Sequence, residues 1–185
     1  MSTPPRPGDL LVAVPHLTDP NFRRAVVLVL HRDDEGAFGV VLNRPIPVPV
    51  AAVLPAWQES VAEPSTLFQG GPVGLDGALG VATLRAGVAP PRAVTRVASG
   101  FGLVDLDAEP EAVRDVLGLR VFAGHAGWSG GQLEGEVAAG DWFVFPALPA
   151  DVVSTDPEHL WRTVMRRQGG AMAIVSTFPD DPSLN

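Results

Sequence analysis

The stretch that decides the fold is residues 25–45, which read AVVLVLHRDDEGAFGVVLNRP. Its pattern predicts a β-hairpin. Residues 25–31 are apolar and rich in β-branched side chains, as is typical of a buried strand. The acidic residues 33–35 and Gly36 have the composition of a turn, and residues 37–43 predict the antiparallel return strand. Residues 44–49 cannot form a central strand, because their prolines donate no ladder hydrogen bond.

Short apolar runs on either side of this hairpin predict further strands. They lie at residues 10–14, 79–84, 94–97, 119–123, 142–145 and 171–177. Helices are predicted at residues 107–117, 132–139 and 157–168, and the last begins with Asp156 as N-cap and Pro157 at the first helical position. Many short strands, about three short-to-medium helices and no regular βαβ alternation indicate an α+β fold.

The composition predicts a single compact domain that spans all 185 residues, with residues 1–8 as an extended N-terminal segment. Hydrophobic residues make up 46% of the chain, which is enough to build a core. The longest clean apolar run, residues 25–30, is much shorter than the roughly 20 residues of a membrane-spanning helix. We therefore expect a cytoplasmic protein that makes no contact with membranes.

The residue types in the chain exclude several kinds of functional site. The absence of cysteine excludes disulfides, zinc fingers and thiol nucleophiles. The four histidines show no metal-ligand spacing, so neither a metal nor a cofactor is predicted. The net charge of −8 disfavours direct nucleic-acid binding, because phosphate recognition requires a positive surface. All 13 cationic residues are arginine, and the clusters at residues 23–24 and 162–167 are interpreted as solvated faces.

A serine hydrolase is the first alternative that the sequence raises. Gly127-Trp128-Ser129-Gly130-Gly131 matches G-x-S-x-G between a predicted strand and a predicted helix, which is where a nucleophile elbow occurs. The acid and histidine that such a triad needs also follow in the chain, as Asp151, Asp156 and His159. However, the upstream pattern predicts hairpins rather than βα units, and a glycine-rich turn matches the motif for conformational reasons alone.

Two other segments contain residues suited to ligand binding. Gln69-Gly70-Gly71-Pro72 offers backbone amides that bind an anion, or simply a tight turn, and it lacks the lysine of a P-loop. Asn43-Arg44-Pro45 places an amide, a guanidinium and a rigid corner at the end of a strand. This group either orients a polar ligand or caps the strand.

These segments resemble the AlgH/YqgE family of bacterial proteins. The resemblance rests on four ordered blocks at residues 22–27 (FRRAVV), 36–45 (GAFGVVLNRP), 70–73 (GGPV) and 124–134 (GHAGWSGGQLE), followed by Asp141-Trp142. It implies an α+β fold of bent, mostly antiparallel sheets that form a barrel-like body. It implies no established activity: one member is labelled a regulator of alginate production, but the family has no recognised DNA-reading element.

We hypothesise that the signature residues gather around one ligand cleft. The predicted ligand-binding residues are Asn43, Arg44, Gly70, Gly71, Pro72, His125 and Trp128. Position 125 usually holds tyrosine in the family, and position 129 is varied, which disfavours a nucleophile there. The sequence thus predicts a non-enzymatic binding or regulatory protein whose partner is an unknown small molecule or protein. The alternatives are a hydrolase that uses Ser129 and a transcriptional regulator that acts directly or through a protein partner.

Overall fold

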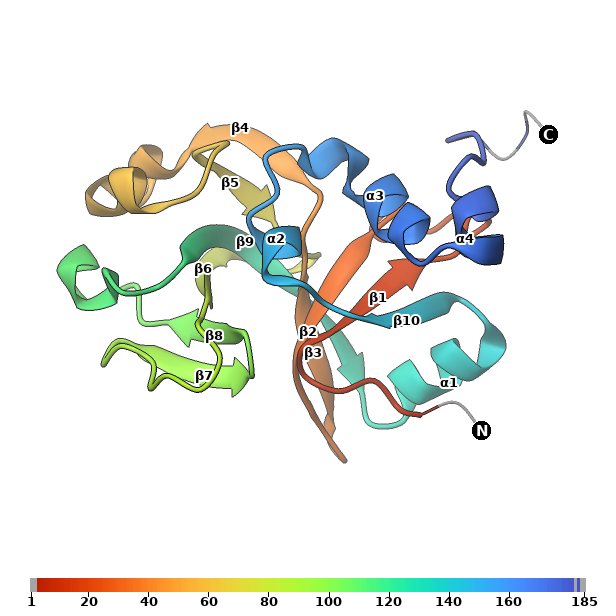
Figure 1. The fold of residues 1–185 in the computed structure, drawn as a ribbon, viewed down its shortest axis with the longest axis horizontal. Helices are drawn as coiled ribbons and strands as arrows, with labels where there is room; N and C mark the ends of the chain where they lie inside the picture. The colour runs from red at the N-terminus through yellow and green to blue at the C-terminus, as the bar shows by residue number, and fades with distance from the viewer. Residues whose placement is uncertain (1–2, 182, 184–185) are drawn as a thin grey trace.

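A ten-stranded sheet forms the body of the protein in the computed structural model, which describes residues 3–181 and 183 (Figure 1). Its main path runs in the order β10-β1-β2-β3-β9-β6-β8-β7, and β5 pairs with both β4 and β9. The strands are β1 (Asp9–Ala13), β2 (Val26–Asp33), β3 (Gly36–Val41), β4 (Pro45–Pro49), β5 (Thr66–Gln69), β6 (Val73–Thr83), β7 (Val94–Ala98), β8 (Phe101–Val104), β9 (Gly118–Ser129) and β10 (Trp142–Pro146). All pairings except β5–β9 are antiparallel, so the predicted α+β class with a curled, barrel-like sheet is confirmed.

The helices are short. The α-helices are α1 (Gln132–Ala139), α2 (Pro149–Val152), α3 (Leu160–Arg167) and α4 (Gly170–Val175), and the 3-10 helices are η1 (Val50–Ala52), η2 (Pro55–Ser60), η3 (Pro110–Val113) and η4 (Pro157–His159). Helices α3 and α4 lie together on one side of β1 and β2, whereas α1 lies on the other side (Figure 1). Among the described residues, no helix has the length and apolarity needed to cross a bilayer.

The predicted hairpin is confirmed as β2 and β3, which pair from Val27↔Val41 to Asp33↔Gly36. The Asp33 carboxylate closes the turn, because its Oδ1 accepts hydrogen bonds from the backbone N–H groups of Glu35 and Gly36. Both faces of the hairpin are buried, which explains its continuous apolar run. On β2, Val26, Leu28 and Leu30 pack towards Trp161 of α3, whereas Val27 and Val29 pack in the cluster that contains Trp128 and Leu133 of α1.

Two element predictions are wrong, and one strand was not predicted. Only η3 forms within residues 107–117, because the Leu117 N–H donates to Thr83 O (2.9 Å) and draws the chain into the sheet. Residues 171–177 are mostly α4 and not a strand, because Met172 and Val175, one helical turn apart, both pack on the core. Strand β8 was not predicted: it contains Gly102, where a Cβ would lie 2.4 Å from Val94 Cγ1.

The interpretation of residues 162–167 as a solvated face is also wrong in part. Arg167 donates from Nη1 and Nη2 to the two carboxylate oxygens of Asp151 (2.5 and 2.7 Å), whose exposed fraction is 2%. Arg162 donates to the backbone oxygen of Ser176. Arg166 is exposed, as expected. These arginines therefore connect α3 to the segments before and after it.

Arg120 of β9 is the most deeply buried charge, with an exposed fraction of 1%. Its guanidinium donates to the backbone oxygens of Val152 (2.9 Å), Ser154 (2.9 Å) and Glu63 (2.6 Å), and lies 4.3 Å from the ring centroid of Phe68. Burial lowers the pKa of Arg120 to about 10, so the group remains charged at neutral pH. Arg120 therefore joins β9 to the loop before β5 and to the end of α2.

Replacing Arg120 is expected to destabilise the whole fold. Arg120→Ala leaves three backbone oxygens without their donors and opens a cavity, so we expect a loss of about 3–5 kcal/mol in the free energy of unfolding. Arg120→Lys should lower the free energy of unfolding by most of the same amount, because an ammonium group cannot reproduce the planar arrangement of guanidinium donors. Urea unfolding followed by circular dichroism measures both changes.

The matched control is Arg114→Ala, because that side chain is 74% exposed and makes only a 3.6 Å ion pair with Glu111. It should cost less than about 0.5 kcal/mol. A loss as small as this in Arg120→Ala would show that Arg120 does not join the segments.

Candidate functional site

A pocket of about 180 Å³ lies where three distant segments meet. It is lined by Pro20, Asn21, Val41, Arg44, Gln69, Gly71 and Pro72. Three of the predicted ligand-binding residues, Arg44, Gly71 and Pro72, are therefore brought together. Val41 ends β3, Arg44 precedes β4 and Gln69 ends β5, so the pocket lies at the edge where these strands separate.

Backbone hydrogen bonds hold these segments in place. The Gln69 N–H donates to Arg44 O, and the Val41 N–H donates to Gly70 O, both over 2.8 Å. The Gly70 N–H donates to Ala123 O of β9, also over 2.8 Å. The Gly70 N–H is thus already used within the fold. It is not free to bind an anion together with the other glycine amide, as the sequence suggested.

The two glycines are required because β9 passes so close to them. A Cβ on Gly70 would lie 2.3 Å from Gly124 O, and one on Gly71 would lie 2.2 Å from His125 O. Neither distance is possible for a real side chain. The Gly-Gly pair therefore allows two backbones to approach each other, and the pocket lies on the other side of that contact.

Arg44 is the cation of the pocket. It is half-buried, and its Nη2 donates to Arg23 O over 2.7 Å. Burial alone lowers the pKa of Arg44, and within the described part of the chain no carboxylate forms an ion pair with it. A half-buried guanidinium without a counterion, next to the amide side chains of Asn21 and Gln69, favours an anionic or polar ligand.

Asn43 supports the neighbouring corner and does not line the pocket. Its Nδ2 donates to Arg24 O (2.8 Å), and its Oδ1 accepts from the Val26 N–H (3.0 Å). Both ends of the amide are therefore used to position the backbone before β2. Of the two explanations that the sequence left open, the geometry of Asn43 matches a strand-end cap.

His125 lies on β9 in a separate aromatic group. Its ring meets Phe38 edge-on at a centroid distance of 5.9 Å, and Phe38 stacks on His31 at 5.7 Å. His31 in turn pairs with Asp33 over 2.8 Å. The side chain of His125 does not line the pocket, although its backbone contacts Gly71.

Trp128 belongs to a buried aromatic cluster with Phe22 and Trp142. Its exposed fraction is 6%, its ring stacks with Phe22 at 6.0 Å and meets Trp142 edge-on at 6.1 Å. Both indole Nε1–H groups donate to Glu136 Oε2 over 2.9 Å, and Gln132 Nε2 donates to Glu136 Oε1. Trp128 therefore anchors α1 to the sheet, away from the pocket beside Arg44.

The structure pairs two of the hydrolase candidates, but among the described residues no hydrogen bond joins this pair to Ser129. Ser129 is exposed at the end of β9, and its hydroxyl donates to Gln132 Oε1 over 3.3 Å. His159 instead pairs with Asp156 over 2.8 Å, and this hydrogen bond raises the pKa of His159. The remaining acid, Asp151, is bound to Arg167. Ser129 and Asp151 thus have other partners, and of the predicted triad only the acid–histidine pair is formed.

Asn21 and Gln69 are the site residues that the sequence analysis did not select. Gln69 is adjacent to the glycine pair and could have been chosen for that reason, whereas Asn21 carries no signal beyond its place in a turn. Within the described residues, no group of three or more His, Asp or Glu side chains is arranged to hold a metal ion. The chemistry available in the pocket is therefore binding by a guanidinium and two amides.

Comparison with known proteins identifies relatives of the chain. A family model described as AlgH-like matches residues 10–173. A UPF0301 protein of Streptomyces coelicolor is 56% identical over 182 residues, which cover 96% of this chain and 94% of the relative. A UPF0301 protein of Thermobifida fusca is 49% identical over 187 residues, with 96% and 94% covered.

Two solved structures are similar to this fold. A crystal structure of a protein from Corynebacterium diphtheriae has a TM-score of 0.90 at 40% identity and covers 96% of this chain and 95% of its own. The solution structure of the AlgH protein from Pseudomonas aeruginosa has a TM-score of 0.67 at 26% identity, with 97% of both chains covered.

The role of Trp128 as a structural residue is tested through its acceptor. Glu136→Ala leaves two buried indole N–H groups without a partner, at about 1–3 kcal/mol each, so we expect a loss of about 2–4 kcal/mol in the free energy of unfolding. Glu136→Gln keeps one side-chain oxygen and should lose less. Urea unfolding followed by tryptophan fluorescence measures both, and equal, negligible losses would contradict the assignment.

Proposed function

The chain belongs to the AlgH-like family. We propose that it is a binding or regulatory protein that holds a small anion in the pocket beside Arg44. The proposal includes a cytoplasmic location and an effect exerted through the bound ligand or through a protein partner. It assigns no catalytic reaction to the pocket.

The single observation that carries the proposal is the environment of Arg44. Its guanidinium is half-buried, has lost solvation, and has no counterion among the described residues. Retaining such a charge costs free energy, and an anion in the pocket would offset that cost. Asn21 and Gln69 add side-chain amides that donate to oxygens, as a carboxylate or phosphate ligand requires.

The size of the pocket limits the ligand. Its volume of about 180 Å³ is below the ~300–1,000 Å³ of pockets that enclose drug-sized molecules. A carboxylate or phosphate group fits this volume, and any larger part of the ligand would extend into solvent. The pocket therefore suits recognition of one charged group.

The other functions have weaker support. A hydrolase that uses Ser129 would have to bring the His159–Asp156 pair to the Ser129 hydroxyl, which now donates to Gln132. A regulator that binds DNA directly would have to overcome the net charge of −8. This alternative is tested by measuring the binding of promoter and random DNA at increasing salt concentrations. Direct binding at low salt would favour it.

The pocket is tested by isothermal titration of the full chain with inorganic phosphate and with acetate. We expect at least one of them to bind, and the affinity to fall by about tenfold or more in Arg44→Gln, because the charge-assisted hydrogen bond is lost. Native mass spectrometry of the freshly purified protein gives a second measurement, in which a retained anion should disappear from the same variant.

Arg114→Gln is the control for this titration, since it removes an equal charge from an exposed site. It should leave the affinity unchanged. Equal affinity in the wild type and Arg44→Gln would show that Arg44 does not hold the anion.

The absence of serine chemistry is tested with a fluorophosphonate probe. We expect no labelling of Ser129, because its hydroxyl is bound to Gln132 and no histidine activates it. Stoichiometric labelling that is lost in Ser129→Ala, measured by intact mass, would instead support the hydrolase.

A further inference from the structure

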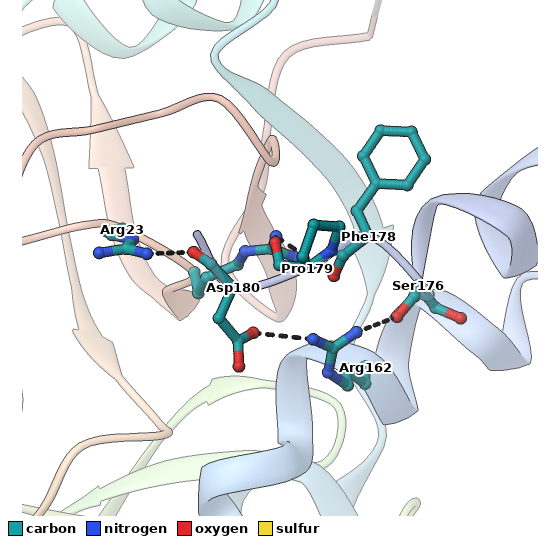
Figure 2. Close-up of polar contacts among 7 residues, drawn as sticks. Arg23, Arg162, Ser176, Phe178, Pro179 and Asp180 are labelled. Carbon is teal, nitrogen blue, oxygen red and sulfur yellow. Dashed lines mark hydrogen bonds and ion pairs between the residues drawn. The ribbon is translucent and has the colours of Figure 1, made fainter. Parts of the chain in front are cut away.

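The C-terminal segment 176–181 lies against three arginines that come from two different parts of the chain. Figure 2 shows the Arg23 guanidinium donating to the backbone oxygen of Asp180, and Arg162 bridging Ser176 O and the Asp180 carboxylate. Arg24 donates to Pro179 O. Arg23 and Arg24 precede β2, whereas Arg162 lies on α3, so the segment fills a site that the fold assembles from separate elements.

Arg24 is held in an unusual conformation. Its φ is +56°, the one positive value among the described residues other than glycine, and such backbone strain is concentrated at functional sites. The Asn43 side chain fixes this backbone: its Oδ1 accepts from the Val26 N–H, and its Nδ2 donates to Arg24 O. The guanidinium lies 4.1 Å from the ring centroid of Trp161, whose Nε1 donates to Ala13 O over 2.8 Å. The position of this cation is therefore well determined.

The hydrogen bonds of Arg24 are incomplete. Its Nε and Nη1 are buried, and neither has a hydrogen-bond partner among the described residues. Only Nη2 is used, and it donates to main-chain oxygens of the C-terminal segment. Backbone carbonyls are weaker partners for a guanidinium than a carboxylate is. Desolvation is the main cause that lowers the pKa of Arg24, and the charges of Arg162 and Arg23 lower it further.

The charges around the three arginines do not balance. The Asp180 carboxylate pairs with Arg162 over 2.8 Å, and it also raises the pKa of Arg24 without forming an ion pair with it. Asp181 is exposed, and its carboxylate interacts electrostatically with Arg23. Three cations thus face two carboxylates among the described residues, which leaves a charge for a further anion.

An apolar pocket of about 450 Å³ adjoins Arg24. It is lined by Val14, Pro15, His16, Arg24, Gly140, Phe143, Val175, Phe178 and Pro179. Its volume is within the ~300–1,000 Å³ of small-molecule sites, and most of its walls are aliphatic or aromatic with a cation at one side. Phe178 and Pro179 form part of the wall, so the segment that contacts the arginines also covers the pocket.

We propose that this pocket and the three arginines bind a carboxylate that carries an apolar body, and that the Asp180 carboxylate takes the place of the ligand's carboxylate when the ligand is absent. The segment has the chemistry of such a ligand, because an aromatic ring and a proline lie at the pocket and a carboxylate lies at the arginines. The ligand inserts its apolar body into the pocket and its carboxylate pairs with Arg24 and Arg162. It displaces the Asp180 carboxylate from Arg162 and accepts from Arg24 Nε and Nη1, which have no partner among the described residues, while Phe178 and Pro179 remain as walls of the pocket.

This inference goes beyond the anion site beside Arg44. The two pockets share no lining residue. Both lie beside the corner at residues 23–24, because Arg24 lines one pocket and Arg44, which lines the other, donates to Arg23 O. Either site can be lost without the other, so the two proposals can fail separately.

The test titrates the full chain with sodium decanoate, below its micelle-forming concentration, by isothermal calorimetry. We expect saturable binding that weakens by about tenfold or more in Arg24→Gln, since the cation that pairs with the carboxylate is lost. Val175→Trp, which fills the pocket, should abolish binding. Decan-1-ol has the same chain without the charge and should bind far more weakly than decanoate.

The matched control is Arg166→Gln, because Arg166 is exposed on the same helix as Arg162. It should bind decanoate like the wild type, whereas Arg162→Gln should weaken binding by about fivefold. Arg162→Gln also tests the proposal if Arg24→Gln does not fold. Asp180→Asn should strengthen binding by about twofold to fivefold, because an exposed ion pair of the competing segment is removed.

Nitrogen-15 NMR then locates the bound decanoate. Shifts of the Val14 and Val175 amides, with Gly71 unchanged, would support the proposal and separate it from the Arg44 site. The proposal is overturned if neither the wild type nor Asp180→Asn binds decanoate, if Arg24→Gln and Arg162→Gln bind it as tightly as the wild type, or if the shifts occur elsewhere.

Discussion

Arg120 places a buried guanidinium where three parts of the chain meet, and much of the architecture depends on it. Its three acceptors are backbone oxygens of Glu63, Val152 and Ser154, so the bonds are lost if any of these segments moves away. A buried charge without a carboxylate depends on its remaining hydrogen bonds, and those of Arg120 come from Nη1 and Nη2, because its Nε has no partner among the described residues. The contact with Phe68 beneath it adds to this requirement. One residue of β9 thus fixes how the end of α2, the loop after it and the loop before β5 lie against the sheet.

Strand β9 extends this constraint to the pocket. It pairs with β3, β5 and β6, and its backbone passes close to Gly70 and Gly71. Because those glycines have no side chain, the ends of β3 and β5 approach each other and Arg44 is brought beside them. The positioning of the pocket is therefore a consequence of sheet pairing, and the polar residues in it need no regular structure of their own.

Arginine has two different roles in this chain, which contains no lysine. Arg120 and Arg167 satisfy groups within the fold, whereas Arg24 and Arg44 are half-buried and lack an ion pair among the described residues. Asn43 and the corner at residues 23–24 connect these last two. The sequence shows both kinds of arginine in similar apolar surroundings. Only the distances to carboxylates and carbonyls distinguish a structural cation from one available to a ligand.

The sequence by itself determined the hairpin of β2 and β3, α1, the α+β class and the family, because these depend on local periodicity, turn residues and ordered motifs. It also selected Arg44, Gly71 and Pro72. Tertiary structure alone decided that Trp128 packs under α1, that residues 170–175 form a helix, and that residues 176–181 cover three arginines. The physical reason is that each depends on a partner far away in the chain, and side-chain type does not specify which partner that is.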